Sequence, residues 1–111
     1  MDFDVINAEA NPELLEFYMD CLQFELQGVQ SLYEFRKVLS EKTAQSDLRE
    51  WHTHTLIFED NTDGDDGRPE MILHDMFNDE PSIGFDQDRF FEIIRTVIFR
   101  NPNNPSSKTL H

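Results

Sequence analysis

The sequence has few basic residues. Nine lysines and arginines stand against 23 aspartates and glutamates in 111 residues, which gives a formal net charge of -14. None of the nine bases precedes Arg36, whereas eight carboxylates do. A charge balance this one-sided repels nucleic acid and anionic membranes, and it attracts basic proteins.

Cysteine and long apolar runs are also scarce. The single cysteine, Cys21, cannot form an internal disulfide, and its helical spacing from Tyr18 and Leu22 favours a role as a small core residue. No apolar run approaches the ~18 residues of a membrane span, and the first residues lack the basic region of a signal peptide. We therefore expect a cytoplasmic protein.

Catalytic motifs are absent from the sequence. There is no glycine-rich phosphate loop and no Gly-x-Ser-x-Gly elbow, and carboxylates are so numerous that no pair of them is informative. We expect neither an enzyme nor a bound cofactor.

Large apolar residues are abundant nonetheless. The chain is 38% hydrophobic and contains ten Phe, two Tyr and one Trp, far more than a disordered acidic chain carries. The sequence predicts a single acidic domain over residues 1–102 and a mobile tail over 103–111, where little can be buried.

Two helices are predicted in the first half of the chain, over residues 12–27 and 31–42. Asn11 is a typical N-cap and Gly28 a typical stop for the first helix. Ser31 begins a capping box for the second. Because the connection is short, the two helices are expected to form an antiparallel pair.

The second half is predicted to contain a β-hairpin and a helix. Residues 51–58 are rich in β-branched and aromatic side chains, which favour a strand. Residues 70–77 could return as the second strand, and a helix over these residues is the alternative. Residues 87–100 form an amphipathic helix. The alternation over residues 2–6 is too short to separate a strand from a tail. The expected fold class is α+β.

The charge pattern divides the second half. Residues 59–88 contain eleven carboxylates and one base, Arg68, whereas the chain from Arg89 onward carries four bases and one carboxylate, Glu92. This pattern is typical either of a solvated acidic rim or of a binding surface for a basic partner.

Two local patterns contain residue types that bind metals, but we expect a flexible acidic loop and the half-exposed polar face of a sheet there, and no metal site. Residues 59–70 resemble an EF-hand calcium loop, and the residues in the matching positions are Glu59, Asn61, Asp63, Gly64, Asp65 and Glu70. Glutamate in the first position and Asp66 in the apolar eighth position depart from the pattern. His52 and His54 would share one face of a strand, with His74 across the hairpin, which could form a zinc or iron site.

The leading hypothesis is an acidic protein inhibitor that blocks a basic partner, above all a nuclease toxin. The chain resembles bacterial nuclease immunity proteins in size, acidity and lack of a catalytic motif. The alternatives are a DNA mimic that acts against restriction or defence proteins and a calcium-binding module. The predicted partner-binding residues are Glu59, Asp60, Asp63, Asp65, Asp66, Asp75, Asp79 and Glu80, with Trp51 as an aromatic anchor.

Overall fold

The computed structural model describes residues 5–64 and 67–101 and confirms the α+β class. The predicted tail, together with Asp65 and Asp66 of the predicted site, lies outside these residues. The elements in chain order are β1 (Ile6–Asn7), the short 3-10 helix η1 (Ala8–Ala10), α1 (Pro12–Glu25), α2 (Leu32–Ala44), β2 (Glu50–His52), β3 (Leu56–Asp60), β4 (Met71–Asp75), β5 (Ile83–Phe85) and α3 (Gln87–Arg100).

The three α-helices begin at the predicted residues or one position later, because each start is fixed by a local side chain. The Asn11 side chain accepts a hydrogen bond from the N–H of Leu14, and the Ser31 hydroxyl accepts one from the N–H of Glu34. Asp86 caps α3 in the same way. Each cap satisfies a helix-end donor that the helix itself leaves open.

The five strands form one mixed sheet in the order β1-β5-β4-β3-β2. β1 pairs with β5 in parallel, and the other neighbours are antiparallel. β1 and β5 have two and three residues, too few to show a periodic pattern in the sequence.

The predicted strand over 51–58 is two strands joined by a tight turn, so that part of the hairpin prediction needs correction. The hydroxyl of Thr53 bonds to both the carbonyl and the N–H of Leu56 and closes the turn. Threonine and histidine favour strands, and no glycine or proline marks this turn, so sequence reasoning ran the two strands together. The return strand of the predicted hairpin is confirmed as β4.

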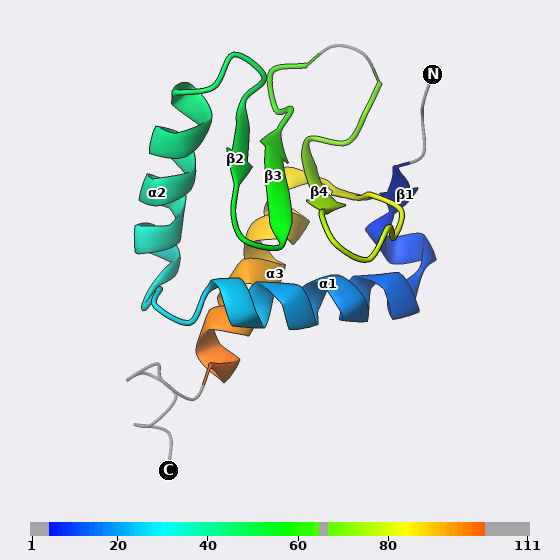
Figure 1. The fold of residues 1–111 in the computed structure, drawn as a ribbon, viewed down its shortest axis with the longest axis horizontal. Coiled ribbons are helices and arrows are strands. Elements are labelled where there is room, and N and C mark those ends of the chain that lie inside the picture. Colours follow the sequence, from blue (N-terminus) through cyan, green and yellow to red (C-terminus); the bar gives the residue numbers. More distant parts are fainter. Residues whose placement is uncertain (1–4, 65–66, 102–111) are drawn as a thin grey trace.

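The core lies between the helices and one face of the sheet. Phe58, Leu73 and Ile83 are paired across three strands on this face and are fully buried. α3 lies behind the sheet in Figure 1, and the view looks onto the face that no helix covers. Phe90 of α3 packs against the buried Phe35 of α2, with ring centroids 6.0 Å apart.

The two N-terminal helices are joined by residues 26–31, and α2 rises steeply from the C-terminal end of α1 (Figure 1). The reason is that α2 packs on the sheet edge and on α3, where Phe35 contacts Trp51 of β2. Within the described ranges, no helix is long and apolar enough to span a membrane.

Candidate functional site

The carboxylates predicted to bind a partner lie at opposite ends of the sheet. Asp60 ends β3 and pairs with Met71 at the start of β4, whereas Asp75 ends β4 and pairs with Leu56. The two ends of β4 are about 13 Å apart. We call the first region the β3–β4 end; it comprises Arg49, Glu59, Asp60, Asp63 and Arg68. We call the second the α1–loop surface; it comprises Glu13, Glu16, Asp20 and Phe24 of α1 and residues 76–80.

Glu59 belongs to a hydrogen-bonded network on the uncovered face of the sheet. Its carboxylate receives two hydrogen bonds from Arg68, at 3.0 and 3.3 Å, and lies 2.8 Å from Nε2 of His74. The other ring nitrogen of His74 lies 2.6 Å from the hydroxyl of Ser82. Glu59 is therefore largely neutralised by its neighbours.

The chain Ser82–His74–Glu59 has the residue types of a nucleophilic triad. Ser82 also lines an open hollow of about 470 Å³, whose walls include the exposed carboxylates Asp79 and Glu80. Negative charge at this position opposes the oxyanion that acyl transfer develops. The network is better suited to joining neighbouring strands than to activating a hydroxyl.

Asp60 is also paired. Its carboxylate accepts a hydrogen bond from Arg49 at 3.1 Å and from the N–H of Thr62 at 3.0 Å. Burial alone would raise the pKa of Asp60, but the hydrogen bonds from Thr62 and Arg49 outweigh it and lower that pKa below its ordinary value. Of the described carboxylates at this end, Asp63 is the exposed one.

The loop that resembles an EF-hand does not bring its first and last ligands together. Glu59 is bound to Arg68 and His74, while Glu70 accepts a hydrogen bond from the N–H of Gln87 at 2.8 Å. The Asn61 side chain donates to the carbonyl of Pro69. These contacts direct the predicted ligands to partners within the protein and do not favour the calcium alternative.

The histidines of the proposed metal site are separated. His54 lies in the turn after β2, with its Nδ1 3.9 Å from Glu25, so it does not share a strand face with His52. Ile57 lies between His52 and His74 in the sheet register. In the part of the chain that the structure describes, no group of three His, Cys, Asp or Glu side chains is placed to hold a metal ion.

At the α1–loop surface, Asp75 organises the connection between β4 and β5. Its carboxylate accepts hydrogen bonds from the N–H groups of Phe77, Asn78 and Glu80, at 3.1, 2.9 and 3.1 Å. Sequence reasoning took Asp75 for a partner-binding residue and missed this role. An aspartate just before an Asn-Asp turn is the signal that could have revealed it.

Hydrogen bonds from Tyr18 and Glu25 hold this connection and the β2–β3 turn against α1. The hydroxyl of Tyr18 donates to the carbonyl of Pro81 at 2.7 Å. The carboxylate of Glu25 accepts hydrogen bonds from the N–H and hydroxyl of Thr55, whose carbonyl accepts one from the N–H of Met76. Burial and then the nearby Asp75 raise the pKa of Tyr18, so its hydroxyl remains a donor.

Cys21 lies on the same side of α1 as Tyr18 and Glu25. Burial raises the pKa of its thiol, and the carboxylates Asp75, Asp20 and Glu25 raise it further. A high pKa keeps the fraction of nucleophilic thiolate small. These surroundings suit a packing residue, as the sequence pattern predicts.

The predicted aromatic anchor, Trp51, is much less exposed than the large apolar side chains of the α1–loop surface. Trp51, the predicted anchor, is half-buried and stacks on Phe58, with ring centroids 4.8 Å apart. Phe77, Phe24 and Met76, by contrast, are 70%, 56% and 43% exposed. Large exposed apolar side chains are often found at binding sites.

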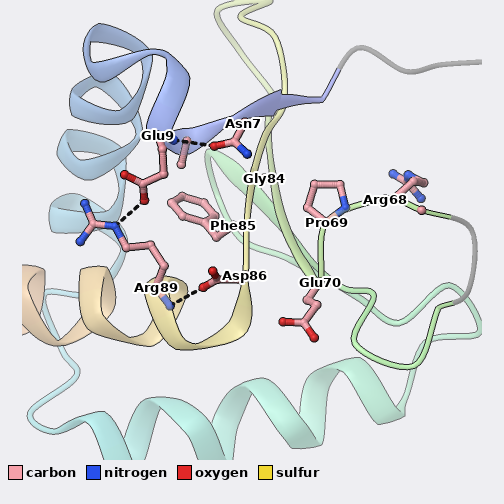
Figure 2. A pocket seen from close by; sticks show the side chains of 11 residues that line it. Asn7, Glu9, Arg68, Pro69, Glu70, Gly84, Phe85, Asp86 and Arg89 are labelled. Atoms are coloured by element: carbon pink, nitrogen blue, oxygen red, sulfur yellow. Dashed lines mark hydrogen bonds and ion pairs between the residues drawn. The ribbon is translucent and has the colours of Figure 1, made fainter.

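A separate hollow of about 320 Å³ lies between η1, the segment before β4 and the start of α3 (Figure 2). Arg89 crosses it to donate to Glu9 at 2.8 Å. Two N–H groups at the start of α3 already bond to carboxylates, that of Gln87 to Glu70 and that of Arg89 to Asp86. The hollow therefore presents paired charges and does not suit a phosphate.

No family model, no curated protein and no solved structure matches this chain.

Proposed function

We propose that this protein is an acidic inhibitor that binds and blocks a basic partner, above all a nuclease toxin, in the cytoplasm. The supporting observation is the α1–loop surface, where Glu13, Glu16, Asp20, Asp79 and Glu80 are all exposed. None of these five takes part in an ion pair with another described residue. A nuclease must be basic to hold phosphates, so such a surface attracts it and competes with its substrate.

The bases of the protein do not cancel this charge, because several of them are engaged elsewhere. Arg49 and Arg68 pair at the β3–β4 end, and Arg89 pairs with Glu9 and Glu92. The guanidinium of Arg36 lies over the ring of Phe91, 4.5 Å from its centroid. α1 itself contains no lysine or arginine.

The test is capture from the lysate of the native host at low salt, followed by elution with rising salt and an activity assay of the eluted protein. The proposal expects one basic nuclease, retained past ~0.5 M salt and inhibited when this protein is added back. Several unrelated DNA-binding proteins released at low salt would instead support a DNA mimic. No retained protein would contradict both.

Charge reversal at the two ends then locates the interface. Asp63→Lys with Asp65→Lys and Asp66→Lys changes the loop first predicted to bind, and Glu16→Lys with Asp20→Lys changes the α1–loop surface. Whichever set carries the interface should slow association strongly at low salt. Circular dichroism of each variant controls for folding.

A further inference from the structure

The α1–loop surface combines three exposed apolar side chains with five exposed carboxylates that form no ion pair with another described residue, whereas Glu59 and Asp60 at the β3–β4 end are paired with arginines. Phe77 and Met76 lie in the connection that Asp75 organises, and Phe24 lies on the helix that supports it. The Tyr18–Pro81 and Glu25–Thr55 hydrogen bonds fix the connection to α1. Glu13 and Phe17 of α1 also line one hollow with Glu80 and Pro81, so this part of α1 adjoins the connection.

The hydrogen bonds to Asp75 also prepare the connection for binding. Three of its N–H groups are already bonded to one carboxylate, so the backbone that carries Phe77 is ordered before any partner arrives. An aromatic side chain on an ordered backbone loses little entropy on binding. Phe77 has the exposure and the support that interface anchors share.

The charge around Phe77 determines what can cover it. Residues 76–86 contain no lysine or arginine, and neither does α1. Nucleic acid and anionic lipid are repelled by such a surface. A polypeptide segment with apolar side chains flanked by lysine or arginine matches both the apolar centre and the acidic surround.

We propose that the α1–loop surface is the docking site for an amphipathic basic segment of a partner protein, with Phe77 as its apolar anchor. This inference rests on the proposed function and locates its interface. Of the predicted partner-binding residues it keeps Asp79 and Glu80, and it replaces those of the segment 59–66 with residues of α1. At the β3–β4 end, Arg49 and Arg68 already neutralise two of the carboxylates that a partner would need.

The test is a titration of the full-length, isotope-labelled protein with two synthetic peptides, followed by NMR. One peptide is a helix of about 14 residues with lysines and leucines on opposite faces, and the other is oligolysine of equal charge. We expect the Lys–Leu peptide to bind more tightly and to shift the amide signals of residues 13–24 and 76–80. Shifts concentrated at residues 59–64, or equal affinity for oligolysine, would overturn the proposal.

Phe77→Ser and Leu48→Ser form a matched pair for this test. Both side chains are 70% exposed, but Leu48 borders the β3–β4 end. Phe77→Ser should weaken binding of the Lys–Leu peptide about tenfold, the loss expected for one buried aromatic group, and Leu48→Ser should leave it unchanged. The opposite pattern would overturn the proposal.

The same two variants separate this inference from the proposed function. If a host nuclease is captured and inhibited, and its affinity falls with Leu48→Ser but not with Phe77→Ser, the inference is wrong and the inhibitor function stands. If the Lys–Leu peptide binds at Phe77 but no basic host protein is captured, the surface is confirmed and the inhibitor function is wrong.

Discussion

The β3–β4 end and the α1–loop surface both carry clustered carboxylates, but only the first supplies them with cations. Glu59 and Asp60 are bound by Arg68 and Arg49, whereas Glu16, Asp20 and Glu80 face solvent. Both regions are acidic in the sequence, and the sequence alone does not show which carboxylates are paired. The electrostatic field of this protein is therefore decided by pairing across the fold rather than by the number of acidic residues in a segment.

The largest expected effect on stability comes from Asp75, which has a structural role although it borders the α1–loop surface. Asp75→Ala removes the acceptor of three N–H groups and should lower the free energy of unfolding by about 2 kcal/mol, measured by urea denaturation. Asp63→Ala is the control at the other end, where an exposed carboxylate should change stability by less than ~0.5 kcal/mol. Equal effects of the two substitutions would show that Asp75 does not organise the connection.

A smaller effect is expected at the β3–β4 end from the pair Glu59–Arg68. A double-mutant cycle with Glu59→Gln and Arg68→Gln should give a coupling energy of about 1 kcal/mol, because the pair is bidentate and partly shielded from water. A parallel cycle on Glu16 and Asp20 should give coupling of the opposite sign. Coupling near zero between Glu59 and Arg68 would remove the distinction between the two regions.

Replacing an aspartate by lysine should change the stability of the protein in opposite directions in the two regions. Asp20→Lys replaces a repulsive pair with Glu16, four residues earlier in α1, by an attractive one, and should stabilise the protein by about 0.5 kcal/mol at low salt. Asp60→Lys places a second cation beside Arg49 and should destabilise the protein. Thermal melts at low salt and at about 0.5 M salt test this, since the gain from Asp20→Lys should shrink with screening. A destabilised Asp20→Lys variant would contradict the interpretation of Glu16 and Asp20 as an uncompensated repulsive pair.

The smallest effect concerns acid stability at the paired end. Because the pKa of Asp60 is lowered in the folded state, its contribution is present above the unfolded pKa of about 3.9 and is lost as the pH falls through the folded pKa. Unfolding free energies measured from neutral to acidic pH should therefore decline less steeply for Asp60→Asn than for the parent protein. Identical slopes would mean that the pairing with Arg49 and Thr62 has no energetic effect.

The parts of the fold that were predictable are those encoded locally. α3 has the predicted bounds, because Asp86 caps it and its apolar face repeats over four turns. The strands β1 and β5 were missed because they form through pairing with distant residues, and the turn at Thr53 was missed because no glycine or proline marks it. The charge pairs follow the same rule: Arg49 reaches Asp60 only once β2 and β3 have paired.

For the candidate site, the acidic character was predictable from the sequence, but the division of the carboxylates into paired and exposed ones was not. Glu59 and Asp75 were assigned to a partner because their hydrogen-bonding groups, Arg68 and the N–H groups of residues 77–80, could not be placed beside them in advance. Phe77 lies within the acidic stretch 59–88, but its exposure depends on how the connection after β4 is folded.

The parallel pairing of β1 with β5 constrains how this protein is made. Ile6 is synthesised well before its partner, Ile83, because most of the described helices and strands lie between them in the chain. The pair is thus a late, non-local closure, which is slow compared with helix formation. Because residues 76–80 lie just before β5 in the chain, the surface that we propose for docking is also completed late, and a shorter nascent chain would lack it.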